Sequence, residues 1–178
     1  MKTKLLFFLM FLLAITGCDK IKDTATINVT TQLNASIPVV VTSIGMKSAG
    51  LVAASGDFSA TADLDLTSNE EIAPYIDRIK TINLNTLIVT INGLSAGQTI
   101  NTVSLNVAGV GVIFTQNNIT MGNNSFTPTI AQEILDKVAS KLTTDRKITL
   151  TVSGNASGPM IFTVDLNIDS TLVVYTLQ

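Results

Sequence analysis

The sequence predicts a mainly β protein, either an antiparallel β-sandwich or a curled, partly open barrel, with about seven to nine strands and one amphipathic α-helix packed on it. Three observations support this fold class. Apolar and polar residues alternate along many short segments. Asn- and Gly-rich turns separate these segments at the spacing typical of sandwiches and barrels. A single stretch after residue 127 instead repeats its apolar residues at helical spacing.

The first half of the domain contains three alternating segments. Residues 25–31 place alanine, isoleucine and valine on one face and polar residues on the other, which predicts a first strand. Residues 37–44 predict a second strand, in which Pro38 is restricted to the first residues or to a sheet edge. Residues 58–66 alternate most clearly, so we expect one face of this strand in the core and the other in water.

A change of period follows between Ser68 and Ile79, where the apolar residues fall at helical spacing. Ser68 and Glu71 are spaced as a capping box. Pro74 lies too deep in the segment for a continuous helix, so we expect two short turns instead.

Two later segments change the parity of their apolar positions. In residues 81–92 the change falls at Asn85 and Thr86, which predicts a bulge or a bend. In residues 102–114 it falls across glycines 109 and 111, and we interpret this segment also as a bent strand. Two bent strands favour a curled or two-sheet structure.

The predicted helix begins at Pro128, with Thr127 as its N-cap, and its apolar stripe runs from Ile130 to Leu142. Its apolar stripe should pack across a sheet or close an open end of the fold. After it, residues 148–152 and 160–168 alternate again around a turn at 155–159, and residues 171–177 form a last strand.

Two absences restrict the chemistry more than any motif that is present. The chain has no histidine, which removes the usual catalytic triads, the common zinc sites and an easy proton shuttle near neutral pH. It also has no tryptophan and only two tyrosines, so a stacking platform for sugars or bases is poorly supplied. We therefore expect a protein that is not an enzyme and that uses no cofactor.

The N-terminus has the pattern of a secretion signal. Lys2 and Lys4 precede an apolar run over residues 5–15, and the small residues Thr16 and Gly17 follow. The run is far shorter than the roughly 20 apolar residues that a transmembrane helix needs. Without residues 1–17, nine lysines and arginines remain against thirteen acidic residues, a net charge of −4. This balance offers no basic surface for nucleic acid.

The signal ends in the motif ITGC, residues 15–18, which contains the chain's single cysteine. This motif resembles the lipobox of bacterial lipoproteins. The resemblance implies transfer of diacylglycerol to the Cys18 sulfur, cleavage between Gly17 and Cys18, and acylation of the new amino group. Two or three acyl chains are enough to hold a protein on a membrane. The alternative is an ordinary signal peptide that ends in a cysteine by chance.

The expected organisation is a cleaved signal peptide at 1–17, a lipidated tether at 18–23 and a single β-rich domain at 24–178. Asp19 directly follows the anchoring cysteine and resembles the inner-membrane retention signal of enteric bacteria, although a periplasmic or surface face of the outer membrane is favoured. The tripeptide DTA is similar to the O-glycosylation acceptor of some Gram-negative bacteria, with Thr24 as the acceptor.

The best candidate for metal binding is DLNID, in which Asp165, Asn167 and Asp169 resemble the opening of a calcium loop. The intervening leucine and isoleucine favour a half-buried strand with a solvated acidic face instead, and the turn glycine and distal glutamate are missing. A weak calcium site remains a hypothesis if this strand lies beside the one that carries Asp63 and Asp65.

Carboxylate pairs are the simplest catalytic groups in a chain without histidine. The candidates are Asp63 with Asp65 and Glu70 with Glu71. Both have structural explanations, because the first pair lies on the exposed face of a strand and the second in the first turn of a helix, where acids favour the dipole.

The sequence is compatible with three functions. The first is a membrane-anchored extracytoplasmic lipoprotein with a structural or binding role in the cell envelope. Its partners would be the membrane, through the lipid on Cys18, and an envelope protein, and the domain resembles small envelope β-sandwich lipoproteins in its pattern. The second is a carrier of lipid or another apolar ligand in a cavity under the helix. The third is an acid-pair hydrolase.

Overall fold

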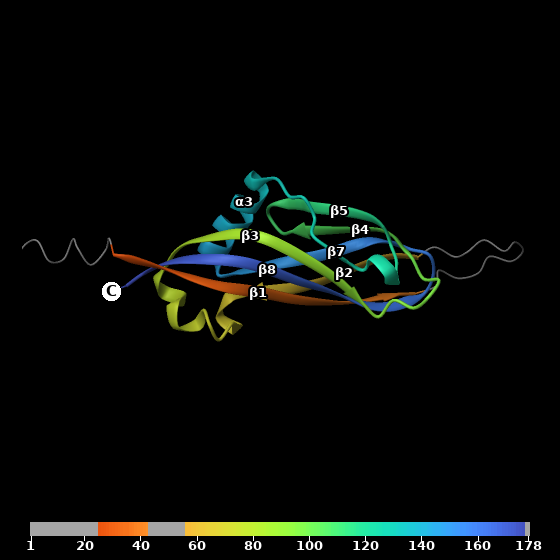
Figure 1. Cartoon of the computed structure of the whole chain (residues 1–178), viewed down its shortest axis with the longest axis horizontal. Helices are drawn as coiled ribbons and strands as arrows, with labels where there is room; N and C mark the ends of the chain where they lie inside the picture. The colour runs from red at the N-terminus through yellow and green to blue at the C-terminus, as the bar shows by residue number, and fades with distance from the viewer. Residues whose placement is uncertain (1–24, 43–55, 177–178) are drawn as a thin grey trace, which may run out of the picture.

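The computed structural model describes residues 25–42 and 56–176, which form two packed four-stranded antiparallel sheets (Figure 1). Sheet A has the order β1-β8-β3-β6 and sheet B the order β2-β7-β4-β5. The predicted sandwich with one helix is confirmed. The elements are β1 (Thr26–Val41), β2 (Gly56–Asp65), η1 (Leu66–Ser68), η2 (Ala73–Arg78), β3 (Ile79–Asn92), β4 (Ile100–Val107), β5 (Gly111–Ile119), η3 (Met121–Asn123), β6 (Ser125–Phe126), α3 (Gln132–Asp145), β7 (Lys147–Ala156) and β8 (Met160–Tyr175).

The two outermost chain segments form longer strands than predicted. The segments at 25–31 and 37–44 belong to one strand, β1, because the intervening residues keep the alternation and bury Leu33. In the same way, the segments at 160–168 and 171–177 belong to β8, in which Ser170 occupies a buried position and donates a hydrogen bond to the Thr31 carbonyl. Each strand is sixteen residues long, and Thr26 pairs with Tyr175, so the first strand begins where the last one ends.

The two parity changes have different causes. In β3 the register with β8 shifts between Leu84 and Thr86, which confirms the predicted bulge. The segment at 102–114 is not a bent strand, and this prediction is wrong. It is a hairpin between β4 and β5, in which Gly109 and Gly111 take the positive φ angles of 79° and 110° that a tight connection needs.

The segment at 66–78 forms two short 3-10 helices on either side of a turn, and Pro74 lies at the start of the second, as the sequence predicts. The predicted capping box is wrong. Asp65 caps the first helix by accepting a hydrogen bond from the Thr67 backbone N–H at 2.8 Å, while the Ser68 hydroxyl donates back to the Asp65 carbonyl.

Helix α3 begins later than predicted, with Ala131 rather than Thr127 at the N-cap. The preceding residues, Pro128 included, are not helical, and Ile130 packs against the core beneath the helix. The helix contacts the sheets through its buried residues Val138, Ala139 and Leu142, mainly on β3. Its other face is exposed.

The core lies between the inward faces of the two sheets and is almost entirely aliphatic. Edge-to-face contacts join Phe58 of β2 to Phe162 of β8, with ring centroids 5.2 Å apart, and Phe114 of β5 to Phe126 of β6, at 5.9 Å. Each of these pairs connects one sheet to the other. Fully burying a large apolar side chain contributes about 1.5–3 kcal/mol, so this core is the main source of stability.

Gly154 of β7 lies where the neighbouring strand β4 leaves no room for a side chain. A Cβ built at this position would lie 1.9 Å from the Thr102 carbonyl oxygen and 2.8 Å from the Phe58 ring. The first neighbour is backbone and cannot move aside. Gly154→Ala should therefore lower the free energy of unfolding by about 1–3 kcal/mol, measured by denaturant titration.

The matched control is Gly122→Ala, where the nearest atom to a new Cβ is the Thr120 hydroxyl at 4.0 Å. This variant should stay within about 0.5 kcal/mol of the parent. Equal stability of the two variants would contradict the close packing of β7 on β4.

Candidate binding surface

The outer face of sheet A carries the residues that the DLNID motif singled out. Strand alternation points Asp165, Asn167 and Asp169 outward from β8, while Leu166 and Ile168 are buried in the core. The interpretation of this motif as a half-buried strand is therefore confirmed.

Polar residues of β1 face these three in register. Cross-strand pairing sets Gln32 opposite Asp169, Asn34 opposite Asn167 and Ser36 opposite Asp165. Asn92 of β3 approaches from the other side. We call these seven residues the sheet A ladder: Gln32, Asn34, Ser36, Asn92, Asp165, Asn167 and Asp169.

Hydrogen bonds connect the sheet A ladder across three strands. Asp165 accepts from the Ser36 hydroxyl at 2.5 Å and from the Asn92 amide at 2.6 Å, so both of its oxygens are bound by uncharged donors. The Asn167 amide donates to the side-chain oxygens of Asn34 at 2.9 Å and Gln32 at 3.1 Å.

Two shallow grooves of about 400 and 410 Å³ open on this face and share Asn34. The first runs over the middle of the sheet, where the half-exposed Ile88 lies among the polar residues. The second lies between β1 and the turn that joins η1 to η2. The linings are Asn34, Ala35, Ser36, Ile88, Thr90, Asp165, Leu166 and Asn167 for the first, and Thr30, Thr31, Gln32, Asn34, Asn69, Glu71 and Asp169 for the second.

The second groove contains a carboxylate pair that sequence reasoning missed. Glu71 and Asp169 both line it, although they are far apart in the chain. Glu71 accepts a hydrogen bond from the buried Thr31 hydroxyl at 2.5 Å, and Asp169 accepts one from the Gln32 amide at 3.3 Å. Glu70, the neighbour that the sequence paired with Glu71, does not line this groove.

The calcium prediction gains no support from this arrangement. Strand β8 pairs with β1 and β3, whereas β2, which carries Asp63 and Asp65, belongs to sheet B. The expected acidic patch therefore does not form. Within residues 25–42 and 56–176, no group of three or more His, Cys, Asp or Glu side chains is close enough to hold a metal ion.

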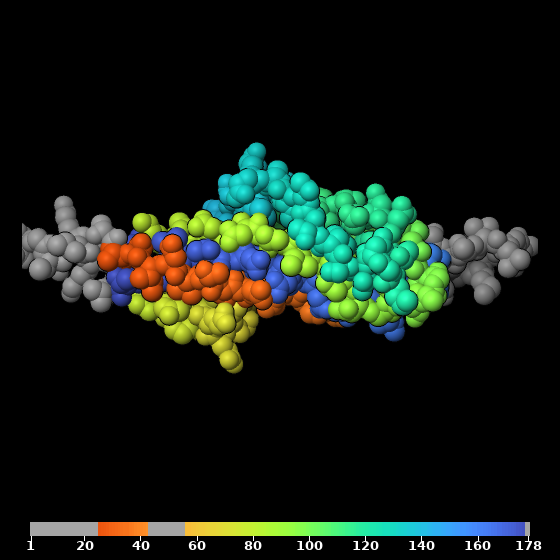
Figure 2. All heavy atoms as spheres, viewed as in Figure 1, coloured from red at the N-terminus to blue at the C-terminus, as the bar shows by residue number. Residues whose placement is uncertain are grey.

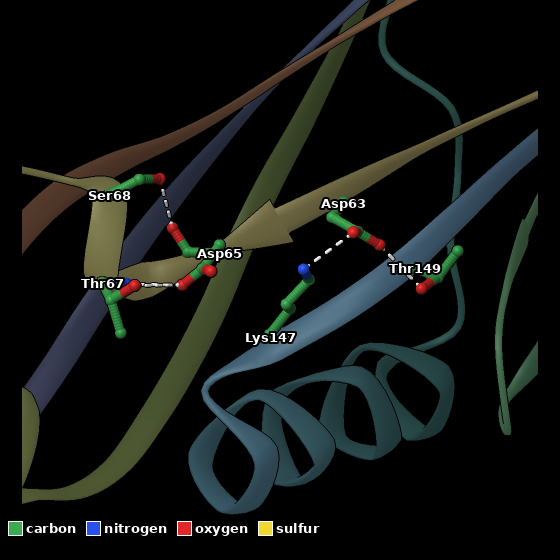
Figure 3. Close-up of polar contacts among 6 residues, drawn as sticks. All are labelled: Asp63, Asp65, Thr67, Ser68, Lys147 and Thr149. Carbon is green, nitrogen blue, oxygen red and sulfur yellow. Dashed lines mark hydrogen bonds and ion pairs between the residues drawn. The ribbon is translucent and has the colours of Figure 1, made fainter.

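Asp63 and Asp65 have separate structural partners at the end of β2 (Figure 3). Asp63 binds the Lys147 ammonium at 2.8 Å and the Thr149 hydroxyl at 2.8 Å, both from β7. Asp65 accepts from the hydroxyl and backbone N–H of Thr67 at the start of η1. Hydrogen bonds from Lys147 and then Thr149 lower the pKa of Asp63, and those from Thr67 lower the pKa of Asp65. A general acid needs the opposite shift.

The apolar space under α3 is small. It has a volume of about 30 Å³ and is lined entirely by aliphatic side chains from both sheets and the helix, among them Ile130, Leu135 and Leu150. A site for a lipid or a drug-sized ligand has several hundred cubic ångströms. This space is therefore a packing defect near the scale of one water molecule.

The pKa shifts at the end of β2 predict acid sensitivity. A carboxyl whose pKa is depressed in the folded state contributes stability above its unfolded pKa and loses that contribution as the pH falls through the folded value. Both folded values lie below the ordinary 3.8. We expect the free energy of unfolding to fall as the pH drops below about 4, and Asp63→Asn or Asp65→Asn to flatten this dependence. Denaturant titrations at pH 7, 4 and 3 measure it.

If the free energy of unfolding of both aspartate variants depends on pH as it does in the parent, these contacts do not stabilise the fold.

The remaining sequence predictions fall on residues 1–24, outside the described residues. They are the signal peptide, the cleavage site at Gly17 and Cys18, the tether at 18–23 and the acceptor Thr24. Among the described residues, no helix combines the length and hydropathy that crossing a membrane requires.

Comparisons with known proteins give the chain no family. No family model matches it, and no curated protein matches it. Among solved structures, it is similar to a chain from a structure of Desmodium yellow mottle tymovirus, with 15% sequence identity and a TM-score of 0.36. The match covers 87% of this chain and 93% of that one.

Proposed function

We propose that this chain is a lipid-anchored binding protein of the bacterial cell envelope, held on the membrane through Cys18. The observation that carries the proposal is the ITGC motif at the end of a short apolar run, followed by a β-sandwich. The carboxylates Asp63 and Asp65 serve structural contacts, which favours a binding or structural role over catalysis.

The start of β1 fixes which end of the sandwich lies near the membrane in this proposal. Residues 19–25 span at most about 25 Å even when fully extended. Thr26 and Tyr175 pair at one end of the long axis (Figure 1), so that end is held close to the lipid. The outer membrane is the favoured location, on its periplasmic or surface face.

The ligand surface in this proposal is the outer face of sheet A. Amide, hydroxyl and carboxylate groups of the sheet A ladder alternate donors and acceptors across two grooves that share Asn34. Ile88 adds an apolar contact in the first groove. This chemistry fits a polyhydroxylated ligand, because sugar hydroxyls both donate and accept, and the C–H face of a sugar packs on aliphatic groups. We therefore assign an envelope glycan as the ligand class.

Two other functions receive less support. A carrier of apolar ligands needs far more space than the 30 Å³ under α3. An acid-pair hydrolase would have to use Glu71 and Asp169, since Asp63 and Asp65 each have a structural partner and a lowered pKa.

Cys18→Ala tests the anchor. Without the thiol no diacylglycerol can be attached, so the protein should leave the detergent phase in Triton X-114 partitioning, and incorporation of labelled palmitate should fall to background. The control Lys20→Ala changes the same tether but keeps the acceptor, and it should behave as the parent.

Protease treatment of intact cells that carry the parental protein then reports the membrane face. Palmitate incorporation in the Cys18→Ala variant would refute the anchor, whichever face the protease finds.

Asn167→Ala tests the ligand surface. This side chain lies at the centre of the sheet A ladder, and its loss removes two hydrogen bonds that orient Gln32 and Asn34. On an array of bacterial envelope glycans, we expect the parent to bind and the variant to bind at least about tenfold more weakly, in line with the loss of one or two hydrogen bonds.

The matched control is Asn155→Ala on the outer face of sheet B, where Asn155 also bridges neighbouring strands. It should bind as the parent does. No glycan binding by the parent, or equal loss in both variants, would remove the outer face of sheet A as a glycan site.

A further inference from the structure

The two grooves on the outer face of sheet A meet a third hollow at the edge of the sheet. This third hollow has a volume of about 210 Å³ and lies between β1, the end of β2 and η1. Asp65 and Ser68 line it, and Figure 3 shows both where β2 ends. Asn34 lines all three spaces, and Asn69 lines the second groove and the third hollow. The three spaces therefore meet around Asn34.

The joined spaces cross several strands of the fold. Figure 2 shows the outer face of sheet A, where β3, β8 and β1 lie side by side and the yellow segment of η1 and η2 projects beside β1. Crossing from β3 to β1 covers two strand spacings, and reaching β2 in sheet B adds one sheet separation, about 20 Å in all. A path of this length exceeds a single sugar ring and accommodates a chain of several.

The first groove places an apolar side chain beside polar ones. Ile88 of β3 is 39% exposed and pairs across the strands with Asn167, and Asp165 lines the same groove. An acetamido group has the matching chemistry, because its methyl packs on an aliphatic side chain and its N–H donates to a carboxyl oxygen. Asp165 accepts one printed bond at each oxygen, from Ser36 and Asn92, and a carboxylate has room for further donors.

The second groove and the third hollow are more uniformly polar. Their lining side chains that are not buried all carry hydroxyl, amide or carboxyl groups, as in Thr30, Gln32 and Ser68. Such groups fit sugar hydroxyls, which both donate and accept. Among the residues that the structure describes, no lysine or arginine lines any of the three spaces, so the lining offers no cation to a phosphate or carboxylate on a ligand.

We propose that the ligand is a linear chain of neutral N-acetylated sugars, with one acetamido group over Ile88 in the first groove and with further units that pass Asn34 and end beside Asp65 and Ser68. This inference rests on the proposed glycan function, and it adds to that function a chain length and a type of sugar. Asn34 contacts the middle of the bound chain, because it borders all three spaces.

The test compares two series of oligosaccharides by isothermal titration calorimetry on the detergent-solubilised full chain. Chitin oligomers consist of N-acetylglucosamine and cellulose oligomers of glucose, with the same linkage, so the two series differ only in the acetamido group. We expect the chitin tetrasaccharide to bind at least about tenfold more tightly than N-acetylglucosamine and than the cellulose tetrasaccharide, a gain that one or two further hydrogen bonds account for.

Two variants examine the two ends of the path, each with a matched control. Ile88→Ser should reduce the preference for chitin over cellulose oligomers, whereas Val112→Ser, on the exposed side of β5 in sheet B, should not. Ser68→Tyr fills the third hollow and should remove the gain from added sugar units, whereas Thr61→Tyr, on the exposed side of β2, should not. Circular dichroism checks that each variant folds.

The outcomes separate this inference from the proposed function. Binding on the array of envelope glycans without a preference for chitin oligomers, or without a gain from monosaccharide to tetrasaccharide, would overturn the inference and leave the glycan site standing. Binding of no glycan at all would overturn both. An equal effect of Val112→Ser and Ile88→Ser, or of Thr61→Tyr and Ser68→Tyr, would overturn the placement of the chain along the three spaces.

Discussion

Strand β8 is the element on which the rest of the structure depends. It pairs with β1 over all sixteen of its residues and with β3 over most of them, so its register is fixed from both sides. Because side chains alternate with a period of two, a slip of one residue would turn Leu166 into water and Asp165 into the core. The bulge between Leu84 and Thr86 keeps β3 in register with β8. Leu84 and Leu87 lie on opposite sides of this register shift, and both are buried.

The fixed register of β8 also creates the candidate binding surface on the outer face of sheet A. The register that buries its even-numbered residues arranges the odd-numbered ones opposite the polar residues of β1. Asp165 is thereby enclosed by two uncharged donors, Ser36 and Asn92, instead of a cation. A carboxylate held in this way is pre-oriented, which lowers the entropy cost of binding a hydroxyl or amide ligand.

The sequence predicts this fold wherever one face of a strand is apolar over several residues, as in 58–66. The prediction from sequence is wrong where a local pattern is compatible with two backbone conformations. Gly109 and Gly111 fit a bend as well as a hairpin, and only the pairing of β4 with β5 decides between them. Thr127 and Pro128 form a good start for a helix, yet Ile130 enters the core from an extended segment. That Glu71 and Asp169 line one groove lies beyond any local pattern, because tertiary packing brings the two segments together.

The chain has few charged residues, and this affects both the cohesion between the two sheets and the protection of the strand edges. Three ion pairs occur in the part of the chain that the structure describes. Two lie within α3, from Lys137 to Glu133 and from Lys141 to Asp145, and the third joins Lys147 to Asp63 within sheet B.

Exposed ion pairs of this kind contribute little to stability because water and salt screen them, and these three do not connect the two sheets. Cohesion between the sheets therefore comes from the aliphatic core and the two aromatic pairs, which need no charge. Strand edges are different, because charge is one of the few means of keeping a strand from pairing with another chain. A protein that covers its outer faces with serine, threonine and asparagine must protect its edges by other means. In this chain Pro38 and Asn69 do so for β1, and the register shift at Leu105 and Asn106 interrupts the ladder of β5.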